Sequence, residues 1–143
     1  MNTNKENPHV GKKFQELTAK LLERLYNVEF ENEISIEIGT PSKPHKFDLV
    51  SVDMNIVAEC KCYTWTKGNN SPSAKMSTLN EAVLYFKLLP HQCKKLIVIK
   101  KSKNPKTGES LGRYYLRRYS FVLEGITVIE LDIDSQTLEI LKN

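Results

Sequence analysis

The chain has 143 residues, of which 40% are hydrophobic and 27% charged, and its formal net charge is +4. This length suits one domain over residues 1–143 with a single core, and it leaves no room for a separate recognition module. Because no apolar run approaches the roughly 18 residues of a membrane span, and because residues 1–10 lack the apolar core of a signal peptide, we expect a cytoplasmic protein with no membrane partner. Three cysteines, an odd number, argue against a disulfide framework and predict reduced thiols.

The chain begins with a predicted amphipathic helix over residues 9–26. Apolar residues recur there at helical spacing, at Val10, Phe14, Leu17, Leu21 and Leu25. On this helix Glu16 falls nearly opposite the apolar stripe, whereas Gln15 lies on its flank. Residues 28–38 alternate between isoleucine and polar side chains, which predicts a half-buried strand, and the turn-rich residues 39–44 end it.

A β-hairpin is predicted next, with strands over residues 47–52 and 56–63 joined by the turn at residues 53–55. If the loop has two residues, counting outward from it places Asp48 directly opposite Glu59. The Cβ atoms of such a cross-strand pair lie roughly 4.5–5.5 Å apart, and like charges there are destabilising. We therefore expect another group to offset the repulsion between these carboxylates.

A divalent metal ion would offset it, since Mg²⁺ binds one or two carboxylates together with waters and substrate phosphate oxygens. Lys61 shares a strand face with Glu59 and would bring a positive charge toward the bound water or phosphate. The alternative is a solvated strand face on which a lysine pairs with Asp48. The functional interpretation is favoured because the two strands are otherwise apolar. Cys60 and Cys62 lie on the opposite face, where burial as small hydrophobic residues is expected.

Four further elements are predicted: a helix, a strand, a helix and a strand over residues 73–89, 94–101, 110–124 and 126–131. We expect Ser73 and Ser110 to cap the two helices. Trp65 precedes these elements and is predicted to pack over the core, although stacking on an unpaired base is an alternative. The tail from Asp132 onward is expected to add little.

Positive charge is concentrated between Lys75 and Arg118, where eleven Lys and Arg residues stand against two acidic residues. Such a concentration is typical of a phosphate-binding surface, although a solvated lysine-rich exterior is an equally simple interpretation. The candidate nucleic-acid-binding residues are Lys75, Lys101, Lys103, Lys106, Arg113 and Arg117.

The spacing of Asp48, ten residues, and then Glu59-Cys60-Lys61 resembles the PD-(D/E)XK motif of the restriction-endonuclease-like nuclease superfamily, with Phe47 in place of the family's proline. The run GKKFQELTAKLL resembles the start of the branch that contains type IV restriction enzymes and Holliday junction resolvases. The acidic position of that branch falls on Gln15, which makes Gln15 a candidate helper near the metal or its water and Glu16 the alternate.

The order of the first six predicted elements coincides with the αβββαβ core of this superfamily. The resemblance therefore implies an α/β fold with a mixed central sheet flanked by helices, in a single PD-(D/E)XK nuclease-like domain.

The function that the resemblance implies is a metal-dependent DNA endonuclease that hydrolyses phosphodiester bonds without reading sequence. Asp48, Glu59 and the backbone carbonyl of Cys60 would hold Mg²⁺, or Mn²⁺, and Lys61 would position the attacking water or neutralise developing charge. A homodimer or a recognition partner is expected, because one small domain cuts one strand. Two alternatives stay open, a catalytically inactive nucleic-acid-binding module and an assembly subunit with the same fold. The substrate form, whether duplex, single strand or junction, also stays open.

Overall fold

The computed structural model describes residues 7–65, 72–90 and 92–143. These residues form a six-stranded sheet with three α-helices and one short 3-10 helix packed around it. In chain order the elements are α1 (Asn7–Tyr26), β1 (Phe30–Ile38), β2 (Lys43–Ser51), β3 (Ile56–Lys61), α2 (Ser73–Phe86), β4 (Lys94–Lys100), α3 (Leu111–Tyr119), η1 (Ser120–Val122), β5 (Ile126–Asp132) and β6 (Thr137–Lys142).

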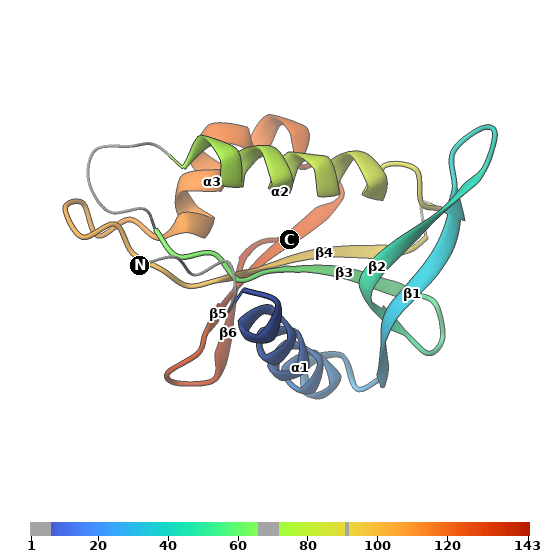
Figure 1. Ribbon diagram of the computed structural model, residues 1–143, viewed down its shortest axis with the longest axis horizontal. Coiled ribbons are helices and arrows are strands. Elements are labelled where there is room, and N and C mark those ends of the chain that lie inside the picture. The colour runs from blue at the N-terminus through green and yellow to red at the C-terminus, as the bar shows by residue number, and fades with distance from the viewer. Residues whose placement is uncertain (1–6, 66–71, 91) are drawn as a thin grey trace.

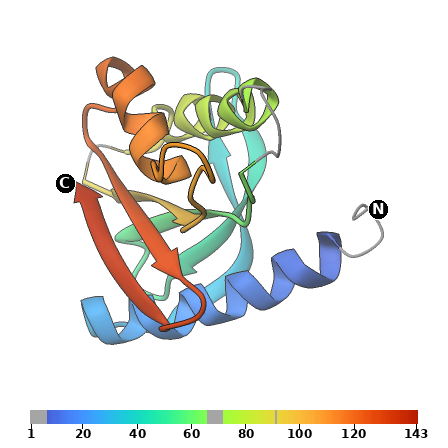
Figure 2. The same cartoon turned by 90° about the vertical axis from the view of Figure 1, so that its left-hand side faces the viewer.

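The strands lie in the sheet in the same order as in the chain. Strands β1, β2 and β3 are antiparallel, β3, β4 and β5 are parallel, and β6 returns antiparallel to β5. Helix α1 covers one face of the sheet, and α2 and α3 cover the other (Figures 1 and 2). The predicted α/β class, with a mixed central sheet flanked by helices, is confirmed.

Each face of the sheet has its own hydrophobic core. On the α1 side Phe14 and Leu22 pack against strand residues such as Leu49, and on the α2–α3 side Phe86 and Tyr115 are fully buried. Helix α2 buries the stripe that its sequence spacing predicts, made of Met76, Leu79, Ala82, Val83 and Phe86. A sheet covered on both faces explains why the central strands are almost continuously apolar.

Partway along the β1–β2 hairpin, the side chains that would regularly face one core of the sheet face the other core instead. Phe47 packs into the α2–α3 core, whereas Leu49, which would share its face in a regular strand, packs into the α1 core. In the same way, Phe30 lies in the α1 core and Ile34 packs against the α2–α3 core. Between them Glu33 has a φ of 54°, an unusual value for a residue other than glycine.

Several element ends differ from the predictions. Helix α2 starts at Ser73 itself, and its N-cap residue, Pro72, offers no side-chain hydrogen bond. Ser110 does cap α3, and its side chain accepts a hydrogen bond from the amide of Arg113 at 3.3 Å. Helix α3 ends at Tyr119, earlier than predicted, because η1 tightens the turns that follow.

The expectation that the tail adds little is wrong, because Thr137–Lys142 forms β6 along the edge of β5. The turn before it is closed by Asp132, whose carboxylate accepts a hydrogen bond from the amide of Asp134 at 3.0 Å. Leu138 then packs against the α1 core and Leu141 against the α2–α3 core. The tail thus covers what would otherwise be an apolar sheet edge.

The expectations for the packing of Trp65 and for the reduced cysteines agree with the structure. Trp65 is 7% exposed and meets Tyr114 edge-on at 5.2 Å between ring centroids, so it packs over the core. All three cysteines are free thiols. Within the described residues, no helix has both the length and the apolar character needed to cross a membrane.

Candidate active site

Asp48 and Glu59 lie opposite each other on β2 and β3, as the hairpin register predicts. The backbone pairs Val50 with Val57 and Leu49 with Ala58, and the next position along this register joins the two acidic residues. There the backbone pairing ends, and side chains replace it. The amide of Asp48 donates to Glu59 Oε2 at 2.8 Å, and the amide of Cys60 donates to Asp48 Oδ2 at 2.8 Å. Each carboxylate is therefore held by the opposite strand.

The arrangement disfavours ionisation of the Glu59 carboxyl, because this side chain is only 8% exposed. Burial, followed by the charge of Asp48, raises the pKa of Glu59 to about 7. Lys61 opposes this shift more weakly. Among the residues that the structure describes, no ion pair within 4.0 Å joins Lys61, or any other cation, to either carboxylate. Within the described residues, the alternative in which a lysine pairs with Asp48 is therefore not observed.

Helix α1 contributes Gln15 to the site. The Gln15 side-chain amide donates to the backbone carbonyl of Asp48 at 3.0 Å and approaches Asn32 Oδ1 at 3.5 Å. The structure thus brings the Gln15 side chain to the main chain of Asp48, one of the two acidic residues. Glu16, the alternate, is exposed on the outer side of α1.

Cys60 occupies the site through its backbone, while its side chain packs against the α1 core. Burial, followed by the charges of Asp48 and Glu59, raises the pKa of the Cys60 thiol well above its ordinary value. A thiol with this pKa remains protonated and unreactive at neutral pH. The sequence predicts that Cys60 and Cys62 are both buried, whereas the structure shows both only partly buried against the α1 core.

Sequence reasoning assigned nothing to His45, yet the fold brings it near the site. Its ring stacks on Tyr85 of α2, with centroids 3.7 Å apart and planes 17° apart, and meets Phe47 edge-on. Burial lowers the pKa of His45, whereas Glu81 and Asp48 act in the opposite direction. The only sequence signal was its place on the same strand, three residues before Asp48.

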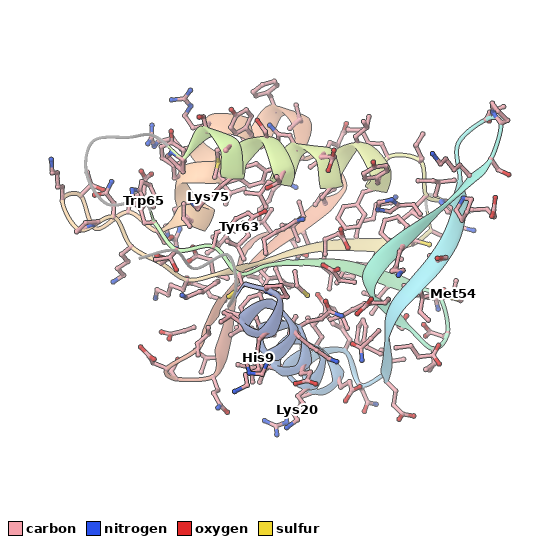
Figure 3. All side chains as sticks on the ribbon, viewed as in Figure 1. His9, Lys20, Met54, Tyr63, Trp65 and Lys75 are labelled. Atoms are coloured by element: carbon pink, nitrogen blue, oxygen red, sulfur yellow. The ribbon has the colours of Figure 1, made fainter. Side chains whose placement is uncertain are left out.

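The candidate nucleic-acid-binding residues gather around the carboxyl ends of β3 and β4. Figure 3 shows Lys75 and Trp65 at this end of the molecule, far from the Met54 turn that joins β2 to β3. Lys101, Lys103 and Lys106 lie in the segment between β4 and α3, and Arg113 and Arg117 lie on α3.

Both arginines already have acidic partners. Arg113 contacts Glu139 at 3.0 Å, and Arg117 makes two hydrogen bonds of 2.9 Å with the carboxylate of Glu109. Arg117 also lies over the ring of Tyr114, with 5.2 Å between its guanidinium carbon and the ring centroid. A phosphate group would have to compete with these carboxylates for the two guanidinium groups.

Within residues 7–65, 72–90 and 92–143, no group of three or more His, Cys, Asp and Glu side chains has a geometry suited to holding a metal ion. The site instead has two carboxylates and the backbone of Cys60. Comparison of the chain with protein-family models, with curated proteins and with solved structures finds no match. The interpretation of the site therefore depends on its own geometry.

Proposed function

We propose that this protein is a metal-dependent nuclease that hydrolyses DNA phosphodiester bonds. The observation that carries the proposal is the convergence of Asp48 and Glu59 at the end of the β2–β3 pairing. One of these acids is buried, with its pKa raised to about 7, and neither has a cation within ion-pair distance in the described part of the chain. Strongly perturbed carboxylates are characteristic of functional sites.

The order of elements supports assigning the chain to the PD-(D/E)XK superfamily. Helix α1, strands β1 to β3, helix α2 and strand β4 follow one another in the αβββαβ order, and the motif residues fall on β2 and β3. Gln15 lies beside Asp48 at the position where the resemblance places the glutamate that the first helix usually offers to the site, so the chain matches the family in location but not in residue type.

The site fits a hard divalent cation such as Mg²⁺ or Mn²⁺. Hydrogen bonds in the described residues use one oxygen of each carboxylate, which leaves Asp48 Oδ1 and Glu59 Oε1 as ligands. The backbone carbonyl of Cys60 is the third candidate ligand, because the amide of the same residue already contacts the Asp48 carboxylate. A bound metal would supply an activated water and stabilise charge on the phosphate.

The remaining residues would bind and orient the substrate. Lys61 would neutralise negative charge that develops on the phosphate, because it follows Glu59 on the same strand face. The basic residues around α2, α3 and the segment between β4 and α3 would hold the DNA backbone, which positions the substrate without reading its sequence. Cleavage of both strands would require a homodimer or a recognition partner.

The test is cleavage of linear duplex, single-stranded, flap and four-way-junction DNA with Mg²⁺, with Mn²⁺ and with EDTA. We expect metal-dependent cutting that Asp48→Asn and Lys61→Ala each reduce by at least roughly a hundredfold. Lys46→Ala is the matched control, because Lys46 is an exposed strand lysine with only a 3.9 Å ion pair to Glu33. Wild-type protein that cuts no substrate with either metal would refute the nuclease.

One observation favours a second candidate, a catalytically inactive nucleic-acid-binding or assembly subunit. The position where the related branch has an acid is Gln15, whose amide is engaged with a backbone carbonyl, so the site has two carboxylates only. This candidate predicts that the wild type binds DNA, or a protein partner, in the same panel without metal-dependent cleavage.

A further inference from the structure

The backbone of Asp48 is unusual because strand pairing is interrupted at this residue on the β1 side and ends just before it on the β3 side. On the β1 side the register passes from Asn32–Leu49 to Ile34–Phe47 without a Glu33–Asp48 pair, at the point where Glu33 has a positive φ. On the β3 side the pairing ends at Leu49–Ala58. The alternation of side chains between the two cores shifts at this point of the hairpin. As a result, Asp48 is not paired with a residue of β1 or of β3.

Two side chains replace the missing backbone partners. Glu59 accepts the hydrogen bond from the Asp48 amide at 2.8 Å, and Gln15 donates one to the Asp48 carbonyl at 3.0 Å. Gln15 comes from α1, and its approach to Asn32 also connects that helix to β1. A backbone carbonyl inside a protein requires such a donor. Gln15 therefore completes the hydrogen bonding of Asp48 where the sheet does not.

We propose that Gln15 is a positioning residue that holds the carboxylate of Asp48 in place through the main chain of Asp48. The inference rests on the proposed function to the extent that Asp48 acts in catalysis. With its carbonyl held by Gln15 and its amide by Glu59, Asp48 is oriented so that its Oδ2 accepts the hydrogen bond from Cys60. Gln15 thus acts through Asp48 and does not itself touch the reacting atoms.

The geometry requires a hydrogen-bond donor at position 15. An ionised glutamate has only acceptor oxygens, so it would face the carbonyl oxygen of Asp48 with no hydrogen to share. It would also add a third negative charge near Asp48 and Glu59. An acid at this position, typical of the related branch, would therefore weaken the site in this chain.

Three variants distinguish the effect of losing the hydrogen-bond donor at position 15 from the effect of adding a negative charge there. Gln15→Met keeps the length and helix propensity of the side chain but removes the donor. Gln15→Glu removes the donor and adds a charge. Lys13→Gln is the matched control, because Lys13 is an exposed residue of α1 two positions before Gln15.

The first measurement is amide hydrogen exchange, without metal or DNA. Asp48 and Cys60 are the informative amides, because each donates to the carboxylate of the other strand. We expect both to exchange roughly three- to tenfold faster in Gln15→Met and Gln15→Glu. The amide of Ile97, in the central strand β4, should not change, which excludes general loss of stability. Unchanged exchange at Asp48 and Cys60 in Gln15→Met would overturn the proposal.

The second measurement is the rate of cleavage over a range of DNA concentrations that reaches saturation. We expect kcat to fall roughly ten- to a hundredfold in both Gln15 variants while KM stays near the wild-type value. The control Lys13→Gln should match the wild type in both constants. Activity in Gln15→Glu equal to that of the wild type would also overturn the proposal. Wild-type protein that does not cleave refutes the nuclease alone, because the exchange measurement still decides the role of Gln15.

Discussion

At the scale of single residues, the decisive feature is a buried acid beside another acid. Glu59 lies in an apolar strand, and its hydrogen bond from the Asp48 amide only partly compensates for its lost hydration. Its ionised form is therefore disfavoured in the folded protein relative to the unfolded chain. The cost of ionising Glu59 lowers the stability of the folded protein, so selection for stability alone would not favour an acid at this position.

The first prediction follows from the pKa of Glu59, which is about 7 in the folded protein against an ordinary 4.5. Because the folded state binds the proton of Glu59 more tightly than the unfolded chain does, protonation of Glu59 stabilises the folded protein. This stabilisation is complete below about pH 4.5 and is lost as the pH rises to about 7. The expected loss is about 3 kcal/mol in the free energy of unfolding. Urea unfolding at pH 4.5 and pH 8 measures it.

The control for this measurement is Glu59→Gln, which has no proton to release. The difference between wild type and variant isolates Glu59 from His45, whose lowered pKa changes stability with pH in the opposite sense. An identical pH dependence in the two proteins would contradict the pKa assigned to Glu59.

A second residue-scale prediction concerns the metal. A cation that binds the two carboxylates stabilises the folded protein by mass action. Because protons compete with the metal for Glu59, we expect 10-fold more Mg²⁺ to be needed for each unit that the pH lies below about 7. Thermal unfolding with increasing Mg²⁺ at pH 6 and pH 8 tests this, and Glu59→Gln should show little stabilisation at either pH.

At the scale of elements, the start of α3 depends on a glycine. Gly112 donates its amide to Glu130 Oε2 at 2.9 Å, and Glu130 is only 1% exposed. A Cβ added at Gly112 would lie 2.6 Å from that oxygen and 2.8 Å from Leu141. The close approach of α3 to β5 and β6 therefore requires glycine here.

We predict that Gly112→Ala lowers the free energy of unfolding by about 1–3 kcal/mol, since α3 must shift to accept the added carbon. Gly11→Ala, in α1, is the matched control, because a Cβ there meets nothing within 4 Å. That control should raise stability by roughly 0.5–1 kcal/mol through helix propensity. Chemical denaturation of both variants measures the contrast, and equal effects would contradict the packing at α3.

At the scale of the whole molecule, the two faces of the sheet differ in their expected roles. Lys75 on α2 and Lys20 on α1 lie on opposite sides of the sheet (Figure 3). Only the first side has the additional basic residues of α3 and of the segment before it. If DNA binds there, the two faces should contribute differently to affinity.

We predict that Lys103→Ala weakens DNA binding and reduces the slope of log affinity against log salt by roughly 0.7–0.9, the loss of one phosphate contact. Lys103 is exposed in the segment between β4 and α3. Lys20→Ala, which removes the same charge from the α1 face, should leave the slope unchanged. Fluorescence anisotropy at several salt concentrations makes the comparison, and equal slopes for both variants would contradict the assignment of the face.

Local spacing along the chain is enough to predict several features of this protein. The order of the elements from α1 to β5, the buried stripe of α2 and the register that sets Asp48 opposite Glu59 all follow from periodicities of two or 3.6 residues and from one short turn. These features require only neighbouring residues, so a single sequence contains them.

Contacts between groups that are distant in the sequence follow from the packed fold and not from local spacing. It placed the tail as β6, paired Arg117 with Glu109, stacked His45 on Tyr85 and directed the Gln15 amide to the Asp48 carbonyl. Each of these contacts depends on how the helices and strands pack and on where the β1–β2 hairpin changes face. Packing is set by the summed burial of both cores, which no local pattern along the chain expresses.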